Sequence, residues 1–274
     1  MNTIDVMLTN GWDRIAYNIL RGLAREGLKV VFGTDNHLGM GYYSKYDSAK
    51  FIHHNYKKSE ELFIRDIIDA INKFKPNVYI PTGEEIFAVS RNITELKKAG
   101  VKIPISDINT LESLNNKVFS FRLAQSAQIP IPDTIVPDDL SEIQHFIDKN
   151  GLPVIFKKSW SRSAQGVFRV DNFNLSEIQS LIKKYKFEFG KFILQKFVRG
   201  ETYGVSVLMN NGDPRAVFTH KRLREKIKTG GPSTLRISTR NSKLEDLAIN
   251  LLSSVKFHGV AMIEFKFDEK TGDA

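Results

Sequence analysis

The spacing of apolar and polar residues over the first hundred positions predicts alternating strands and helices. Short runs rich in β-formers predict strands, and apolar residues at helical spacing predict helices. The strands are expected at 4–8, 28–32 and 78–80, and the helices at 13–25, 60–74 and 84–99. Residues 36–58 follow neither period. This alternation is typical of a doubly wound, mostly parallel sheet, so an α/β domain is expected over 1–107.

The pattern changes after Ile105. One helix is expected over 111–127, ended by the prolines of Ile129–Pro132. Further strands are expected at 134–136, 154–157, 167–170, 192–197, 202–209, 216–219 and 259–267, and helices at 140–150, 176–185 and 244–256. Because helices are mixed with mostly antiparallel strands, the second domain, residues 108–274, is expected to be α+β.

Composition excludes several classes of protein. The 274 residues contain no cysteine, which excludes a disulfide scaffold, a thiolate zinc site and a cysteine nucleophile. The sequence contains no run of about 18 apolar residues, so no membrane span is expected. Asp5, inside the apolar N-terminal run, argues against a signal peptide. We therefore expect a cytoplasmic protein of two domains with no membrane partner.

Positive charge is concentrated in one segment. Residues 215–243 hold nine basic residues against the single acidic Glu225, within a chain whose formal net charge is +9. Such a segment indicates a local anionic partner. A nucleic acid is one such partner. Phe218, however, is the only Phe, Tyr or Trp there for base stacking, so this is the weaker interpretation.

The turn after the first strand lacks a dinucleotide fingerprint. Thr9–Asp13 contains one glycine, not the three spaced glycines that bring a pyrophosphate close to a helix N-terminus. We therefore expect the N-terminal sheet to shape one wall of a substrate cleft.

The second domain contains four short motifs suited to binding an anion. Gly151–Lys157 is an apolar strand that ends in a lysine, whose desolvation is costly unless an anion neutralises it. Ser159–Gly166 is a loop of small and hydroxyl residues, compatible with either a phosphate-binding flap or a solvated hairpin. Phe192–Glu201 runs from an apolar strand through a turn to a carboxylate. Gly259–Phe265 places Glu264 in an apolar strand, where a buried carboxylate requires Lys, Arg or a metal as partner.

In this order the four motifs resemble the ATP-grasp superfamily. The resemblance covers the whole chain and implies a pre-ATP-grasp domain over 1–107 and an ATP-grasp domain over 108–274, with subdomains 108–196 and 197–274. It implies a carboxylate–amine (C–N bond-forming) ligase, in which Mg²⁺-ATP phosphorylates a carboxylate and an amine attacks the acyl phosphate. The implied cofactors are ATP and Mg²⁺, with Mn²⁺ as an alternative. The implied partners are a small carboxylate and an amine.

The resemblance also implies a role for each matching residue. The implied ligands are Lys117 and Lys157 for the phosphates, Ser161 and Gly166 in the flap, Gln195, Lys196, Phe197 and Val198 at the adenine hinge, Glu201 for the ribose, and Glu264 for the metal. Each has a plainer alternative, namely a surface or salt-bridged lysine, a glutamate in a turn, or a structural ion pair.

The basic segment 220–236 has two interpretations. It is either a solvated loop or a loop that closes over the γ-phosphate and the acceptor carboxylate. The planar fork of arginine matches carboxylate oxygens, and Gly230–Gly231 would supply a hinge. Arg222 and Arg236 are the catalytic candidates, since each adjoins an apolar residue that could anchor it, and Arg224 is held in reserve.

Three departures from the family pattern matter. The flap holds only Gly166, Gln195 stands where many members have Glu, and 270–274 end the chain in an expected hairpin turn. In relatives a further strand with Glu-Xaa-Asn completes the metal site. We therefore expect a fragment or a shortened chain, inactive through truncation. An ATP-binding regulatory protein without turnover is the alternative, and the oligomeric state stays open, a homodimer included.

Overall fold

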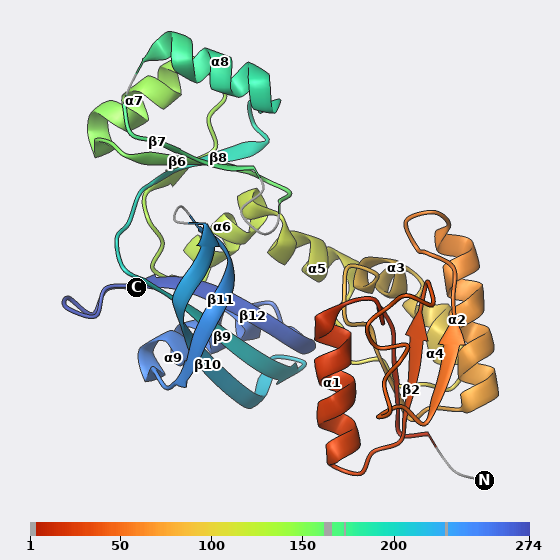
Figure 1. The fold of residues 1–274 in the computed structure, drawn as a ribbon. Coiled ribbons are helices and arrows are strands. Elements are labelled where there is room, and N and C mark those ends of the chain that lie inside the picture. Colours follow the sequence, from red (N-terminus) through yellow and green to blue (C-terminus); the bar gives the residue numbers. More distant parts are fainter. Residues whose placement is uncertain (1–3, 162–165, 173, 228–229) are drawn as a thin grey trace. The chain divides into compact units, whose positions relative to one another are not determined.

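The structure is a computed structural model that describes residues 4–161, 166–172, 174–227 and 230–274. It divides into two compact units, Met1–Ile108 and Asn109–Ala274, and each is described by itself (Figure 1). The central part of the expected flap, residues 162–165, lies outside the described residues. None of the helices in the described ranges is long and apolar enough to cross a lipid bilayer.

The first unit is built on a parallel sheet with the strand order β3-β2-β1-β4. Its strands are β1 (Val6–Leu8), β2 (Val30–Thr34), β3 (Ala49–Ile52) and β4 (Val78–Ile80). Its helices are α1 (Arg14–Arg25), α2 (Glu60–Phe74), α3 (Ile86–Arg91) and α4 (Ile93–Lys98). Every residue of β1 and β2 is buried, which is typical of parallel strands covered on both faces.

Two apolar clusters lie on opposite faces of this sheet. Successive side chains of a strand point to opposite faces. Met7 therefore joins the cluster under α2, with Phe63, whereas Leu8 joins the cluster under α1, with Leu20. Figure 1 shows α1 on one side of the strands and α2 on the other. The predicted doubly wound α/β domain is confirmed.

The sequence interpretation was wrong at two places in this unit. Residues 49–52 form β3, at the edge of the sheet, inside the stretch expected to be irregular. The single helix expected over 84–99 is α3 and α4, separated at Asn92. The Asn92 side chain donates to the carbonyl of Ala88 and to Glu60, so it caps the first helix and ends it.

The second unit begins with two helices and a first antiparallel sheet. The helices are α5 (Ile108–Asn115) and α6 (Lys117–Ser126). The sheet has the order β5-β8-β6-β7, with β5 (Thr134–Ile135), β6 (Val154–Lys158), β7 (Val167–Val170) and β8 (Phe192–Lys196). The helices α7 (Leu140–Asn150) and α8 (Leu175–Tyr185) pack on one face around Phe156, Phe187 and Phe192. Lys157 follows Phe156 and therefore points to the opposite face.

A second antiparallel sheet, with the order β11-β10-β9-β12, completes this unit. Its strands are β9 (Glu201–Asn210), β10 (Asp213–Ile227), β11 (Gly230–Thr239) and β12 (Gly259–Phe267). The helix α9 (Ser242–Ser254) accompanies this sheet. Val205 and Val207 are fully buried, whereas the alternate residues Thr202, Ser206 and Leu208 are not. This sheet therefore has one covered face and one open face, and the predicted α+β domain is confirmed.

Two further expectations were wrong in the second unit. The helix expected over 111–127 is α5 and α6, because the Asn116 side chain accepts from the amides of Val118 and Phe119 and begins a new helix. The basic segment expected as a loop is the hairpin of β10 and β11, in which Arg222 pairs with Arg236 in register. The alternation of apolar and polar residues that predicts a strand is absent here, because polar residues occupy both faces of an exposed hairpin.

Candidate functional site

A half-buried lysine on the first sheet is held by a neutral partner. Lys157 lies on β6, and its Nζ donates to Oε1 of Gln195 on the neighbouring strand β8 at 2.6 Å. The amide nitrogen of Gln195 donates in turn to the Thr134 hydroxyl at 2.8 Å. The side chain of Gln195 is an uncharged amide. Its oxygen therefore accepts a hydrogen bond from Lys157 without neutralising the charge of the lysine.

A second lysine enters the same site from α6. Lys117 is the first residue of that helix, and its Nζ donates to the carbonyl oxygen and the hydroxyl of Ser161 at 2.8 and 2.9 Å. Its backbone amide donates to the carbonyl of Ser159 at 2.9 Å. The structure therefore ties the start of the expected flap to the N-terminus of α6.

The electrostatics of the two lysines favour binding an anion. Burial, followed by the charges of Lys117 and Lys266, lowers the pKa of Lys157 to about 8. Burial also lowers the pKa of Lys117. A cation that is desolvated beside other cations is costly, and an anion at this position removes the cost. The structure therefore brings Lys117, Lys157, Ser161 and Gln195 together, and their roles as nucleotide ligands stay predictions.

The expected adenine hinge is partly occupied by its own backbone contacts. The amide of Lys196 donates to the carbonyl of Asp133, and the amide of Phe197 donates to the carbonyl of Pro153, at 2.9 and 3.2 Å. The Phe197 ring lies 4.4 Å from the guanidinium carbon of Arg169. Within the described ranges, the amide of Val198 has no backbone hydrogen bond, which leaves it as a donor for a ligand.

The flap residue Gly166 has a conformation that restricts substitution. Its φ is +75°, and an added Cβ would lie 3.0 Å from the Lys158 side chain. Its carbonyl accepts from the Lys158 amide at 2.9 Å. Gly166 therefore fixes the end of the flap against β6.

The carboxylate expected to be buried in β12 is exposed. Glu264 is 49% exposed, because it lies on the open face of the second sheet. The expected cationic partner is present, since Arg222 of β10 forms an ion pair with Glu264. Arg222 itself is only 10% exposed and also lies 3.5 Å from Glu225. The expectation of burial was wrong, because an apolar strand sequence does not show that one of its faces is uncovered.

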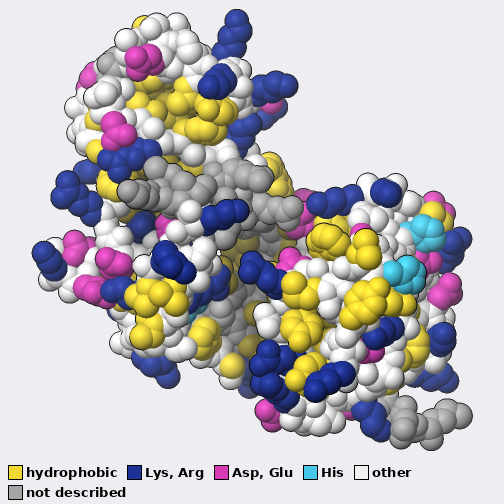
Figure 2. Space-filling model, in the orientation of Figure 1, with side chains coloured by type: hydrophobic (Ala, Val, Ile, Leu, Met, Phe, Trp, Pro, Cys, Tyr) yellow, Lys and Arg dark blue, Asp and Glu magenta, His cyan; other side chains and the backbone are white. Residues whose placement is uncertain are grey.

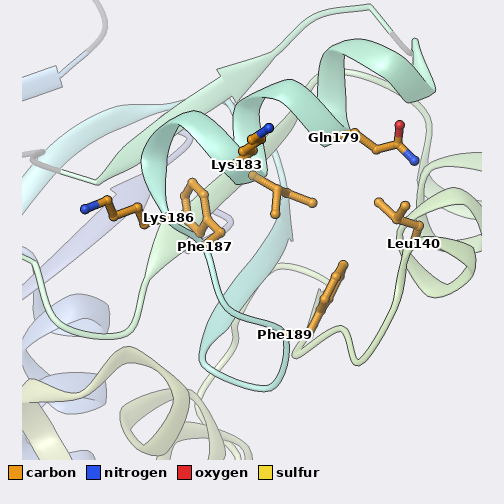
Figure 3. Close-up of a pocket in the computed structure, with 7 residues that line it drawn as sticks. Leu140, Gln179, Lys183, Lys186, Phe187 and Phe189 are labelled. Atoms are coloured by element: carbon orange, nitrogen blue, oxygen red, sulfur yellow. The ribbon is translucent and has the colours of Figure 1, made fainter.

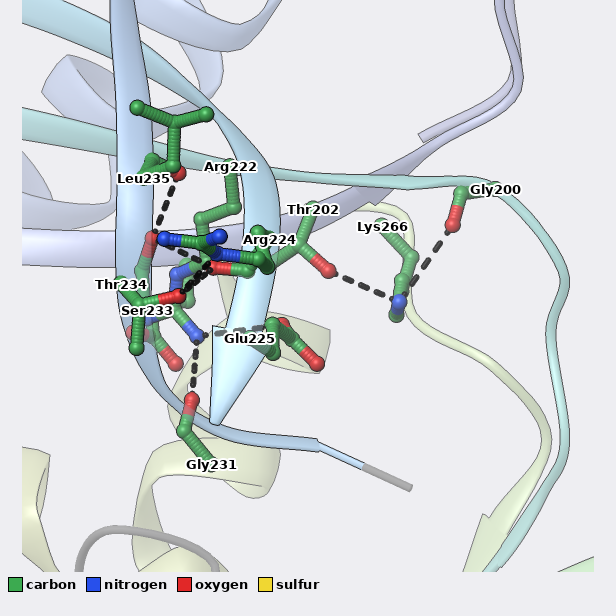
Figure 4. Close-up of polar contacts among 11 residues, drawn as sticks. Gly200, Thr202, Arg222, Arg224, Glu225, Gly231, Ser233, Thr234, Leu235 and Lys266 are labelled. Atoms are coloured by element: carbon green, nitrogen blue, oxygen red, sulfur yellow. Dashed lines mark hydrogen bonds and ion pairs between the residues drawn. The ribbon is translucent and has the colours of Figure 1, made fainter. Parts of the chain in front are cut away.

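A cavity of about 410 Å³ opens beside this ion pair. It is lined by Gly200, Glu201, Thr202, Arg222, Leu223, Arg224, Glu225, Lys226 and Lys266. Figure 4 shows Lys266 bound to the Gly200 carbonyl and the Thr202 hydroxyl, and Arg222 bound to the Gly231 carbonyl. The expected ribose ligand Glu201 is therefore in the same cavity as Arg222. Arg236 is not among the lining residues.

The residues at this cavity do not complete a metal site. Mg²⁺ requires near-octahedral oxygen coordination. Among the residues that the structure describes, no group of three or more His, Asp or Glu could hold an ion. Glu264 supplies one carboxylate, and Arg222 already neutralises it. No step of the chemistry below is therefore assigned to a resident metal ion.

The first unit holds a buried carboxylate that the sequence analysis missed. Glu85 is 2% exposed, and its Oε1 accepts from the Thr9 hydroxyl and from the amides of Thr82 and Gly83 at 2.9, 3.0 and 3.2 Å. Its Oε2 is buried with no partner among the described residues, and burial raises the pKa of this carboxyl. The cluster lies after the carboxyl ends of β1 and β4, the usual position of a ligand site in an open parallel sheet.

A separate apolar hollow lies on the helix side of the first sheet. It has a volume of about 270 Å³ and is lined by Leu140, Gln179, Ile182, Lys183, Lys186, Phe187 and Phe189 (Figure 3). In the space-filling view, apolar side chains gather in the part that carries α7 and α8, with Lys and Arg around them (Figure 2). Since Lys157 points to the other face of the sheet, this hollow is not part of the lysine site.

Comparison with known sequences identifies the domain type of the second unit. The sequence profile of the ATP-grasp domain matches residues 114–269, more than half of the chain. Pyruvate carboxylase from Pichia angusta is 25% identical over 175 residues, which are 59% of this chain and 15% of that protein. The chain therefore spans a small part of the length of this curated relative.

Solved structures show the same fold. The biotin carboxylase domain of Hydrogenobacter thermophilus 2-oxoglutarate carboxylase, in complex with MgADP, ADP and bicarbonate, has a TM-score of 0.71 at 16% identity, covering 98% of this chain and 62% of that chain. L-Amino acid ligase from Bacillus licheniformis has a TM-score of 0.72 at 15% identity, covering 100% and 66%. The chain spans less than two thirds of each of these structures.

Proposed function

The chain belongs to the ATP-grasp domain family, and from this membership we propose that it is an ATP-dependent ligase that activates a carboxylate as an acyl phosphate for attack by an amine. The observation that carries the proposal is Lys157, a half-buried lysine with a pKa lowered to about 8 and a neutral amide as its partner. A triphosphate supplies the negative charge that this site lacks.

The nucleotide would lie between the lysines and the hinge. Lys157 and Lys117 neutralise the phosphates. When Lys117 turns toward the phosphates it leaves the Ser161 hydroxyl, which then donates to a phosphate oxygen. The free amide of Val198 and the carbonyl of Lys196 are suited to the adenine edge, since one donates and the other accepts. Glu201 accepts from the ribose hydroxyls.

The proposed reaction has two steps. A carboxylate oxygen attacks the γ-phosphorus, the bond to the β-phosphate oxygen breaks, and ADP leaves. The amine nitrogen then attacks the acyl carbon, phosphate leaves with the bonding electrons, and the amine loses a proton to solvent. Phosphoryl transfer requires mainly positioning and neutralisation of negative charge. Arg222 and Arg236, paired in register on the hairpin, are the groups that we assign to this neutralisation.

The metal enters this proposal with the substrate, as MgATP. Glu264 is the residue that would contact the ion, and it would first have to leave Arg222. The exchange has a second consequence, because it frees the Arg222 guanidinium for an anionic oxygen. The structures compared above include one in complex with MgADP, which is consistent with this form of the nucleotide.

A second candidate is an ATP-binding protein without turnover. The neutralised Glu264 and the absence of a three-carboxylate cluster among the described residues favour it. It differs from the ligase only at the hairpin, and it retains the lysine site. Cytoplasmic location and a homodimer stay predictions under either candidate.

The test is to trap the acyl phosphate. Hydroxylamine replaces the amine, and a set of carboxylates is screened for equal release of ADP and hydroxamate. The ligase predicts both products from at least one carboxylate. ATP binding with no hydroxamate from any carboxylate would support the second candidate. Arg236→Lys keeps the charge and loses the planar fork, so it should slow turnover and spare ATP binding.

A further inference from the structure

The open face of the second sheet is ordered in rows. Residues paired across neighbouring strands share one face, and every second residue along each strand returns to it. The rows, read from β12 through β9 and β10 to β11, are Val260–Leu208–Ala216, Met262–Ser206–Phe218, Glu264–Gly204–His220–Ser238, and Lys266–Thr202 with Arg222–Arg236. One end of this face is therefore apolar and the other is cationic.

Four side chains of the apolar rows are exposed to solvent. Leu208, Phe218, Val260 and Met262, here called the apolar strip, are between 40% and 67% exposed. They alternate with the residues that are buried on the other face, such as Val205 and Val207. Exposure of neighbouring large apolar side chains has a free-energy cost that a bound apolar group removes.

A neutral ring joins the apolar strip to the arginines. His220 is 3% exposed, and its ring lies against Gly204, where an added Cβ would be 2.4 Å from the ring. It lies 6.3 Å from the Phe218 ring, centroid to centroid, with an interplanar angle of 29°. Burial, and then the charges of Arg236 and Arg222, lower the pKa of His220. The face therefore stays uncharged on β10 until Arg222.

We propose that the carboxylate substrate carries an aromatic or branched aliphatic body that binds on the apolar strip, with its carboxylate directed to Arg222 and Arg236. The proposal rests on the proposed function and names its substrate class. The Phe218 row and the Arg222 row are four residues apart, about 13 Å along the strand. An arylalkyl carboxylate and an arginine side chain together cover that span. A small acid such as acetate would leave the apolar strip uncovered.

The charge distribution selects this occupant over a second copy of the chain. The apolar rows are continuous with a row that presents Arg222, Arg236 and Lys266, and an identical surface offers these charges no free carboxylate, because its own Glu264 is paired with Arg222. A carboxylate with an apolar body complements the apolar end of the face, and it complements the cationic end once Glu264 leaves Arg222.

The test compares two acids that differ in one phenyl group. Binding of 3-phenylpropionate and of propionate to the full chain is measured by ligand-observed NMR titration, with and without a non-hydrolysable ATP analogue. The wild type should bind 3-phenylpropionate about tenfold more tightly than propionate. The double variant Phe218→Ser/Met262→Ser should reduce this preference to less than about threefold. Phe189→Ser, an exposed aromatic residue at the hollow of the first sheet, is the matched control and should keep it.

Each outcome decides one point. Equal binding of the two acids by the wild type, or a preference unchanged in the double variant and in Val260→Ser, would overturn the apolar strip as a substrate site. If the double variant differs from the wild type in mass by sedimentation but not in acid preference, the apolar strip is a protein interface and not a substrate site. Failure to bind the ATP analogue, with the acid preference intact, would reject the proposed function and not the strip.

Discussion

The two sheets of the second unit differ in whether their charged side chains are neutralised by a partner of opposite charge. On the first sheet, the half-buried Lys157 donates to the neutral amide of Gln195, so its charge is not neutralised. On the second sheet, Glu264 and Arg222 neutralise each other. The first arrangement can bind an anion without breaking an ion pair, whereas the second must open one before either group contacts a substrate. We therefore expect the lysine site to bind its anion more readily than the hairpin binds a substrate.

Removing the uncompensated charge should have the largest effect. Lys157→Ala should lower ATP affinity ten- to a hundredfold, since charge-assisted contacts to phosphate contribute ~1.5–3 kcal/mol. Fluorescence titration with a labelled ATP analogue measures the change. Lys149→Ala, an exposed lysine on α7, is the control and should bind as the wild type does. Equal affinities of the two variants would show that the lysine is structural.

Crowding the open face of the second sheet should destabilise the fold. In Gly204→Ala the new Cβ would lie 2.4 Å from the buried His220 ring, so we expect a loss of about 1–3 kcal/mol in the free energy of unfolding. Urea denaturation measures it. Ser206→Ala, two residues along the same face, is the control. A Gly204→Ala protein as stable as the control would show that His220 is free to move aside.

The pH dependence of ATP binding should follow the protonation of Lys157 on the first sheet. Lys157 is protonated below its pKa of about 8, and only the protonated form attracts phosphate. Affinity should therefore be greatest below pH 8 and fall as the pH rises, about tenfold between pH 7 and pH 9. Titrations at half-unit steps measure the profile. The same slope in Lys157→Ala would assign the dependence to another group.

Neutralising the carboxylate of the second sheet should have the smallest effect on stability. Glu264 is half exposed and Arg222 keeps Glu225 at 3.5 Å, so Glu264→Gln should change the free energy of unfolding by less than about 1 kcal/mol. It should impair MgATP-dependent turnover more than adenine binding. A loss of stability larger than that of Gly204→Ala would show that the ion pair is structural.

The sequence predicted most of what depends on local pattern. Alternating strand and helix signals predicted the parallel sheet that the structure has. The lysine at the end of an apolar strand predicted Lys157 as a phosphate ligand, and that role stays a prediction. The strand and helix signals depend on neighbours in the chain, so the chain alone reveals them, whereas the contact of Lys157 with Gln195 joins residues 38 positions apart.

The features that the sequence did not reveal depend on tertiary contacts. The exposure of Glu264 follows from a sheet face that nothing covers among the described residues, and the strands of the basic hairpin follow from pairing in register. Burial of Glu85 depends on Thr9, 76 residues away. Adjacent Glu84 and Glu85 after a strand were the only local signal.

Proton uptake on binding an ATP analogue measures directly whether the charge of Lys157 is left for a ligand. At pH 8 about half of the Lys157 side chains are neutral in the free protein, and binding should restore their charge, with uptake of about 0.5 proton. Calorimetry in two buffers of different ionisation enthalpy measures this number. We expect uptake in the wild type and in Lys149→Ala, and its loss in Lys157→Ala. No uptake in the wild type, or undiminished uptake in Lys157→Ala, would contradict it.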